Sequence, residues 1–248
     1  IITSLIILGS MGFSVIEDVV HIRNFSRFHL HTKIALVTTI ALIVIGTAVF
    51  YFLEQSNTLA SLSFGEKLLA SYFQAVTPRT AGFNTVDMGQ LRIVSILFMC
   101  VLMFIGASPA STGGGIKTTT FALVVLSIRN LLHNEHETVV FNRQIDQSYI
   151  NRAFVIVSLG IIWVVGATFL VANFETASLD KILFEVMSAF ATVGLSTGLS
   201  QHITSASKVV LIITMFAGRV GVLTFALALT SKYKPNSIRY PKEKIMIG

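Results

Sequence analysis

Two short segments of the sequence carry residue types that could hold a bare metal cation. Residues 80–84 read TAGFN and residues 192–196 read TVGLS, so each contains a threonine, one further residue and a glycine. Glycine permits backbone turns that other residues resist, and backbone carbonyl oxygens can replace the water shell of a cation. The pattern predicts a carbonyl-lined ion filter made of Thr80, Ala81, Gly82, Phe83, Thr192, Val193, Gly194 and Leu195.

These two segments belong to an internal repeat. Gly82 and Gly194 lie 112 residues apart (194 minus 82), and the same offset relates residues 103–106 (MFIG) to 215–218 (MFAG). Upstream the offset is 114, because two extra residues, 78–79, are present in the first copy. Matches that keep one order before, within and after the turn are typical of a repeated structural unit.

A third trace of the repeat lies near the start of the chain. Residues 9–12 (GSMG) have the glycine spacing of residues 218–221 (GRVG). We interpret this trace as the end of an earlier repeat whose beginning is missing. The sequence also opens without methionine, as a fragment would.

The composition indicates a membrane protein that crosses the bilayer several times. Charged residues make up 12% of the chain, apolar residues 53%, and the mean hydropathy is +0.77. Segment 34–53 has no charged residue and is long enough to span hydrocarbon. Segments 153–174 and 208–230 also have spanning length, the latter with Arg219 inside it, and segment 1–20 is interpreted as the end of a span.

The basic residues predict the orientation in the membrane. They gather in segments 21–33 and 129–152 and in the tail after Ser231, whereas segments 54–66 and 173–181 are acidic and poor in basic residues. The positive-inside rule therefore places the basic segments and the C-terminus in the cytoplasm. The net charge of +6 does not predict nucleic-acid binding, because these charges flank membrane spans and no recognition fold accompanies them.

Two short runs, 65–77 and 179–191, precede the glycine turns. A helix of about 13 residues reaches only about 20 Å, too short to cross the bilayer core. We expect re-entrant helices buried in protein, with their C-terminal ends near the bilayer centre, where the partial negative charge of a helix end suits a cation. The alternative is a pair of interfacial helices followed by ordinary turns, which the repetition makes less favoured.

Segment 93–130 is mostly apolar, and as one helix it would extend about 55 Å, beyond the hydrocarbon thickness. Its middle holds a proline and three consecutive glycines, so we predict two half-helices joined by an irregular loop that lines water or protein and acts as a gate. Arg219 is expected to donate to backbone carbonyls of this loop or to neighbouring pore elements. The predicted gate residues are Ala107, Ser108, Pro109, Ala110, Ser111, Thr112, Gly113, Gly114, Gly115, Lys117 and Arg219.

Together these motifs resemble the Trk/Ktr/HKT potassium-transporter superfamily over essentially the whole chain. The resemblance rests on residues 72–84, on 106–108 with 113–117, on 188–195 and on 218–221. It implies four helix–pore-helix–helix repeats around one pore that carries K⁺ across the cell membrane, with filter glycines at 82 and 194 and an intramembrane gate at 107–117. It also implies a homodimer, a cytosolic ring of RCK-type regulatory subunits that binds ATP or ADP, and a possible dependence on Na⁺.

The expected architecture is an all-α membrane protein with pore repeats and one broken transmembrane helix. In this scheme two filter glycines of the family have no counterpart in the sequence, so the chain alone cannot close a four-sided pore. The expected units are residues 1–32 (end of an earlier repeat and a cytoplasmic loop), 33–150 (third repeat), 151–231 (fourth repeat) and 232–248 (cytoplasmic tail).

Two other classes of function stay open. A secondary transporter with discontinuous helices would need polar substrate ligands within its spans, for which Glu17 and Asp18 are poor candidates. A membrane scaffold would carry no ion flux. No combination of side chains argues for an enzyme, and no bound cofactor is expected beyond the transported ion.

Overall fold

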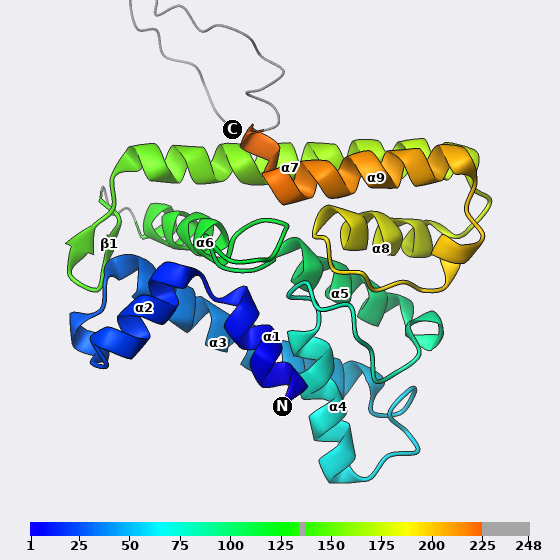
Figure 1. Ribbon diagram of the computed structural model, residues 1–248, viewed down its shortest axis with the longest axis horizontal. Helices are drawn as coiled ribbons and strands as arrows, with labels where there is room; N and C mark the ends of the chain where they lie inside the picture. Colours follow the sequence, from blue (N-terminus) through cyan, green and yellow to red (C-terminus); the bar gives the residue numbers. More distant parts are fainter. Residues whose placement is uncertain (134–136, 225–248) are drawn as a thin grey trace, which may run out of the picture.

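The computed structural model describes residues 1–133 and 137–224, and their secondary structure is almost entirely helical (Figure 1). The predicted tail, 232–248, and the last residues of the predicted fourth repeat lie outside the described residues. The all-α class is therefore confirmed. The helices are α1 (Ile2–Ser10), α2 (Phe13–His21), η1 (Phe25–Arg27), α3 (Leu30–Glu54), α4 (Phe64–Val76), η2 (Met88–Gln90), α5 (Ile93–Phe104), α6 (Thr118–Leu132), α7 (Gln147–Phe174), α8 (Leu179–Phe190), η3 (Leu199–Gln201) and α9 (Ser205–Val220), and a two-stranded hairpin is formed by β1 (Val139–Val140) and β2 (Arg143–Gln144).

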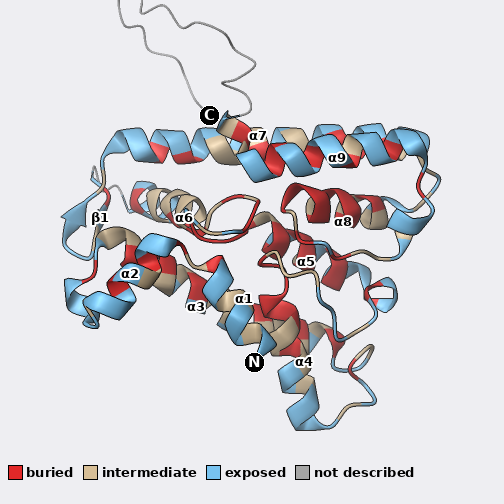
Figure 2. Cartoon of the chain, in the orientation of Figure 1, coloured by how far each residue is buried: buried red, intermediate tan, exposed pale blue. Residues whose placement is uncertain are grey.

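Helices α3 and α7 are long and apolar enough to cross a membrane, with 25 and 28 residues. They contain the predicted spans 34–53 and 153–174. Helix α7 runs beside α9, and both expose long faces, whereas α8 and the loop before α6 are largely buried (Figure 2). The exposed face of α7 carries large apolar side chains such as Ile162 and Phe169, which suits contact with lipid.

Two predicted spans differ from the structure. Segment 1–20, predicted as the end of a span, is bent: α1 and α2 meet at 105° and together form a broken span or a re-entrant loop. The bend occurs where Gly12 approaches the Pro109 carbonyl so closely that a side chain would overlap it. Segment 208–230 is not continuous either: α9 ends at Val220, and Gly221 follows with a φ of 97°, a conformation that glycine adopts readily.

The two short helices form where they were predicted. Helix α4 begins at a capping box, in which Ser63 and Glu66 satisfy each other's backbone N–H groups. It packs along α3, where a Cβ atom at Gly46 would lie 3.0 Å from the Ala75 Cβ. Helix α8 packs against α5, α7 and α9, and its inner face is buried through Phe184 and Phe190. Tertiary contacts on several sides therefore hold both helices.

The overlong apolar segment is broken as predicted. Helix α5 ends at Phe104 and α6 begins at Thr118. The ends of the intervening connecting loop (residues 105–117) are closed by backbone hydrogen bonds from Gly106 N to Ile116 O (2.8 Å) and from Ile116 N to Phe104 O (3.1 Å). The two ends of the loop therefore lie side by side, between the two halves of one interrupted helix.

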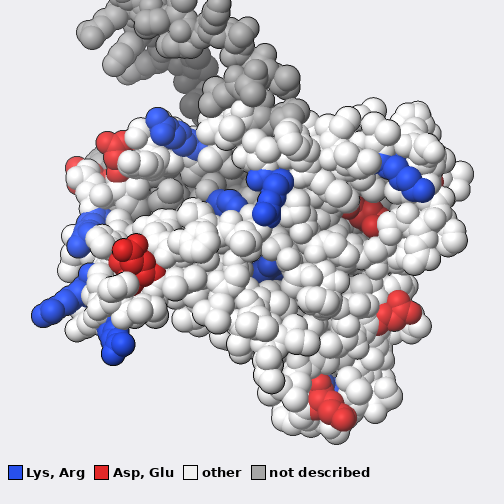
Figure 3. All heavy atoms as spheres, viewed as in Figure 1, with Lys and Arg blue, Asp and Glu red and all other residues white. Residues whose placement is uncertain are grey.

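Basic side chains gather at the end of the molecule that carries α2, β1 and the start of α7 (Figure 3). The two predicted cytoplasmic segments meet there, because Phe25 and Phe141 pack edge to face with ring centroids 6.0 Å apart. The Lys33 ammonium lies 5.7 Å from the centroid of each of these rings. One face of the molecule thus unites segments that the charge pattern assigns to one side of the membrane.

A buried carboxylate lies at the C-terminal end of α3. Glu54 is fully buried, and its Oε1 accepts hydrogen bonds from Arg92 N (3.0 Å) and from the Ser95 hydroxyl. Arg92 caps α5 and Ser95 lies in its first turn. The carboxylate therefore ties the last residue of one helix to the start of another and satisfies a free N–H group there.

The second copy of the repeat uses the same device. Glu175 follows α7, and its Oε1 accepts from Thr204 N (2.8 Å), from the Thr204 hydroxyl (2.8 Å) and from the Ser207 hydroxyl (2.6 Å). Thr204 and Ser207 lie 112 positions after the donors of Glu54, the same offset as between the glycine turns. The internal repeat thus extends to the caps of α5 and α9.

The hydrogen bonds to Glu175 predict that the stability of the fold depends on pH. Hydrogen bonds from the Ser207 hydroxyl, the Thr204 N–H and the Thr204 hydroxyl hold the pKa of Glu175 below its ordinary value. Because the folded-state pKa is the lower one, the stabilisation is complete above the unfolded-state pKa and is lost as pH falls through the folded-state pKa. We expect Glu175→Gln to lower the melting temperature by a few degrees at pH 7. As pH falls below 4.5 and through the lower folded-state pKa of Glu175, the two proteins should converge. A difference in melting temperature that stays equal at every pH would contradict this role.

Candidate functional site

The two predicted filter segments adopt the same unusual backbone. In turn A (residues 80–84), Thr80 has a φ of 65° and Gly82 a φ of 75°. In turn B (residues 192–196), Thr192 has a φ of 53° and Gly194 a φ of 90°. A positive φ is uncommon for a β-branched residue and costs energy that the surrounding structure must offset. The repeat seen in the sequence is therefore also a repeat of backbone conformation.

Turns A and B meet through their glycines. A Cβ atom built at Gly82 would lie 2.7 Å from the Val193 carbonyl oxygen, and one at Gly194 would lie 3.6 Å from the Gly82 Cα. In turn B, Val193 and Leu195 are buried while Gly194 is exposed. In turn B the backbone at Gly194, and not the neighbouring side chains, therefore forms the open surface.

The remaining residues of turn A are less enclosed than those of turn B. Phe83 is 60% exposed, whereas Leu195, in the same register, is 3% exposed. Thr80 and Ala81 are half-buried. Turn A is thus more open than turn B.

Each turn is fastened to the short helix that precedes it. The Thr77 hydroxyl, at the end of α4, donates to the Phe83 carbonyl, and Gln74 Nε2 donates to the Thr85 hydroxyl (3.3 Å). At the end of α8, Val193 N donates to the Ser188 carbonyl (2.9 Å). These bonds position both turns relative to their helices.

The connecting loop lies directly against both turns. A Cβ atom built at Gly113 would lie 3.2 Å from Thr80 Oγ1, and one built at Gly114 would lie 2.5 Å from Thr192 Oγ1. At Gly115, with a φ of 70°, a Cβ atom would lie 3.2 Å from the Ala191 Cβ. Three consecutive glycines are therefore required, because the loop approaches the starts of both turns too closely for side chains.

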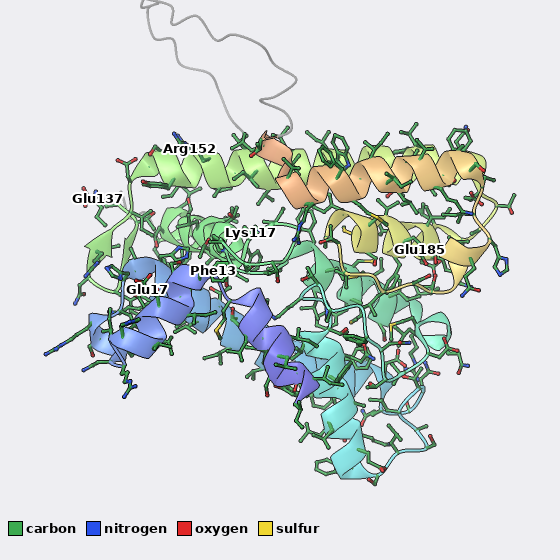
Figure 4. All side chains as sticks on the ribbon, viewed as in Figure 1. Phe13, Glu17, Lys117, Glu137, Arg152 and Glu185 are labelled. Carbon is green, nitrogen blue, oxygen red and sulfur yellow. The ribbon has the colours of Figure 1, made fainter. Side chains whose placement is uncertain are left out.

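Two cationic side chains hold carbonyl groups of this loop. Lys117 Nζ donates to the Gly113 carbonyl at 2.5 Å, and Arg219 Nη1, from the last turn of α9, donates to the Thr112 carbonyl. Figure 4 shows Lys117 in the middle of the molecule, between α6 and the loop. Adjacent carbonyls are thus bound by cations from two different elements, and the bond from Arg219 is the contact that the sequence predicts.

The bend between α1 and α2 holds the loop from another side. Ser108 N donates to the Ser10 carbonyl (3.0 Å), the Thr112 hydroxyl to the Gly9 carbonyl (3.0 Å) and Phe13 N to the Ala110 carbonyl (3.2 Å). The two segments with matching glycine spacing, 9–12 and 218–221, therefore both reach the loop.

Other predicted gate residues stabilise the loop itself. Ala107 is fully buried and its carbonyl accepts from Thr118 N, while the Ser108 hydroxyl lies 3.2 Å from the Thr118 hydroxyl. The Ser111 hydroxyl donates to the Ser108 carbonyl (2.6 Å). Pro109 is the contact point for Gly12.

Sequence reasoning missed two buried charged groups near the turns. Arg79, directly before turn A, is 4% exposed, and its Nη2 donates to the Thr39 carbonyl (3.2 Å). Its Nε and Nη1 have no acceptor among the described residues. Glu185, in α8, is 5% exposed. A charged residue next to or inside a short apolar run was the available signal for both.

The acidic residues that were weighed as substrate ligands have other partners. Asp18 is buried and accepts from the Thr32 hydroxyl (2.5 Å) and from His29 N (3.3 Å), which ties α2 to the start of α3. Within residues 1–133 and 137–224 no group of three or more metal-binding side chains gathers. The described structure therefore offers backbone oxygens, and no cluster of carboxylates, as the candidate ligands of a cation.

Comparisons with known proteins agree with this arrangement. The model of the TrkH family, described as a cation transport protein, matches residues 1–239. The chain is 44% identical to the Ktr system potassium uptake protein B of Bacillus subtilis and 40% identical to that of Vibrio alginolyticus, and it is covered fully in both. It spans about half the length of these relatives, 56% and 55%.

A solved structure has the same fold. The potassium transporter TrkH from Vibrio parahaemolyticus superimposes with a TM-score of 0.73 at 20% identity, over 92% of this chain and 51% of that one. This likeness confirms that the chain has the helical fold of a membrane protein.

The close contact between α9 and the end of α8 generates a stability prediction. A Cβ atom at Gly218 would overlap the Phe190 carbonyl, so Gly218→Ala must displace α9 from the helix that carries turn B. We expect the melting temperature in detergent to fall by several degrees. Gly166→Ala is the matched control, because that helical glycine has nothing within 4 Å of its Cβ position. Equal melting temperatures for the two variants would contradict the close contact.

Proposed function

This chain belongs to the TrkH family of cation transport proteins, and on that premise we propose that it is part of a membrane subunit that takes up K⁺ through a carbonyl-lined filter. The observation that carries the proposal is the meeting of turns A and B at Gly82 and Gly194, with the backbone of Gly194 exposed between two buried side chains. Carbonyls between 80 and 83 and between 192 and 195 would replace part of the water shell of the ion.

Potassium is the proposed ion because relatives at 40–44% identity are named potassium uptake proteins. A further relative, 34% identical, is the potassium/sodium uptake protein NtpJ of Enterococcus hirae, so Na⁺ is the competing or coupled ion to test. Transport would need no chemical step. Inward movement would follow the membrane potential, which contributes about 2.3 kcal/mol per charge for each 100 mV.

The connecting loop is the proposed gate. Its glycines lie against the starts of both turns, so a loop in this position would stand in the way of an ion leaving the filter. Lys117 and Arg219 would hold the loop there through the carbonyls of Gly113 and Thr112. Opening would require these two bonds to be exchanged for others, which makes them points of regulation.

The complete transporter is proposed to hold four repeats, with residues 33–150 as the third and 151–231 as the fourth. We propose that it is a homodimer in the cell membrane with a cytoplasmic C-terminus. A cytosolic ring of RCK-type subunits that binds ATP or ADP would dock on the basic face around 21–33 and 137–152. The names of the relatives, which describe proteins of a Ktr system, and the gathering of basic side chains at one end support this assembly.

The filter is tested by a charged side chain at either glycine. Gly82→Asp and Gly194→Asp each force an L side chain into a left-handed backbone position, and at Gly82 the side chain also meets the Val193 carbonyl. We expect K⁺ uptake at low external K⁺ to fall to background in cells that lack other uptake systems. Gly65→Ala, whose Cβ position is open, is the control that should transport normally. Normal uptake by either Asp variant would remove the filter from consideration.

The gate is tested at Arg219. We expect Arg219→Ala to raise K⁺ flux through the resting transporter several-fold and to weaken its response to the regulatory partner, because the Thr112 carbonyl loses its donor. The ratio of K⁺ to Na⁺ flux should stay as in the wild type, since Arg219 does not touch turn A or turn B. Unchanged resting flux and regulation would exclude this role, and a changed ion ratio would assign Arg219 to the filter.

A further inference from the structure

A buried carboxylate fastens the chain that leaves turn B. Glu185 lies in α8, 5% exposed, and Figure 4 shows it on the side of α8 where the segment after turn B runs. Its Oε1 accepts from the Ser196 hydroxyl at 2.6 Å, from Thr197 N at 2.9 Å and from the Thr197 hydroxyl at 3.2 Å. One oxygen atom of the short helix thus receives three hydrogen bonds from two consecutive residues.

The first copy of the repeat fastens the same position differently. Thr85 lies 112 positions before Thr197, and its hydroxyl is bound by the neutral amide of Gln74, at 3.3 Å. Ser71, which matches Glu185 at the upstream offset of 114, donates to its own helix at Lys67 O. Both copies therefore tie the corresponding threonine to the short helix, and of these two ties the one in the second copy is made by a carboxylate.

The carboxylate tie is the stronger of the two. Hydrogen bonds to an ionised oxygen are roughly twice as strong as neutral ones, and a carboxylate removed from water is stabilised only when donors surround it. The tie also continues along the chain, because Ser196 Oγ accepts from Gly198 N (3.0 Å) and lies 2.9 Å from Ser200 Oγ. Glu185 therefore fixes the whole outer limb of turn B, from 196 to 200.

This limb borders the backbone that the proposed filter uses. Gly194 is two residues before Ser196, and Glu185, Thr192, Gly194 and Ser196 line one cavity of about 310 Å³. A filter distinguishes cations by the number and position of its carbonyl oxygens. A limb that can shift outward would change the position of the Gly194 carbonyl and so the fit to one ion over another.

We propose that Glu185 is a positioning residue that fixes turn B and thereby sets the discrimination between K⁺ and Na⁺. The proposal rests on the proposed transport function. It assigns the effect to the hydrogen bonds at Oε1 and not to the negative charge. A glutamine at the same place keeps an acceptor oxygen, so the two causes can be separated by substitution.

The experiment uses the full-length protein reconstituted in vesicles, and K⁺ and Na⁺ flux are measured for each variant. We expect Glu185→Ala to lower the K⁺-to-Na⁺ flux ratio about tenfold, the change that ~1.4 kcal/mol of lost discrimination gives. Glu185→Gln should restore part of the ratio, because its amide oxygen can accept the same hydrogen bonds in their weaker, neutral form. Glu175→Gln is the matched control, because its carboxylate binds a similar donor set away from the turns and should leave the ratio unchanged.

A second readout does not depend on transport. The Thr197 amide is held by Glu185, so its hydrogen exchange should accelerate at least tenfold in Glu185→Ala and much less in Glu185→Gln. If Glu185→Ala fails to fold, Ser196→Ala removes the shortest of the three bonds and should lower the flux ratio about threefold.

The outcomes separate the two proposals. Normal flux with an unchanged ratio in Glu185→Ala, or in Ser196→Ala where that variant replaces it, overturns the role of Glu185 alone. An equal loss of the ratio in Glu185→Gln and Glu185→Ala also overturns it, since the charge would then be the cause. If vesicles that contain the wild-type protein show neither K⁺ nor Na⁺ flux, the transport proposal is overturned and this inference with it, whatever the hydrogen-exchange rate of the Thr197 amide.

Discussion

The close approach of two backbone turns is the contact on which the rest of the structure depends. At Gly82 the chain comes too close to the Val193 carbonyl for a side chain, and Gly194 opposite it has a φ of 90°. Thr80 and Thr192 take up left-handed conformations beside this contact. Neither feature is favourable by itself, because a left-handed β-branched residue is strained. The short helices, their threonine ties and the loop packed against the turns together offset that strain.

Elements from both ends of the described chain converge on the connecting loop. The bend of α1 and α2 supplies backbone hydrogen bonds, and Lys117 and Arg219 supply cations for neighbouring carbonyls. The two kinds of hydrogen bond differ in the free energy needed to break them. A broken backbone pair leaves both its donor and its acceptor unsatisfied, whereas a long cationic side chain can follow its carbonyl or bind another one. The loop is therefore anchored firmly at the bend and adjustably at the cations.

Local pattern was enough to predict the helical class, the short helices, the break in segment 93–130 and the repeated glycine turns, because repeats, glycines and apolar runs are visible in adjacent residues. It was not enough for the bend at Gly12 or the end of α9 at Val220, since contacts with distant residues, or a single dihedral angle, decide them. The ties of Glu54 and Glu185 were missed for the same reason. The donors to Glu54 Oε1 lie 38 and 41 positions along the chain and those to Glu185 Oε1 lie 11 and 12, and only folding brings each set to one oxygen.

The meeting of the two turns also constrains the order in which the protein matures. Turn B leaves the ribosome 112 residues after turn A, so Thr80 has no partner for its strained conformation during that interval. The first copy can therefore reach its final shape only after the second copy has been made. Translation that stops between the copies would leave turn A without the Val193 carbonyl against which Gly82 packs.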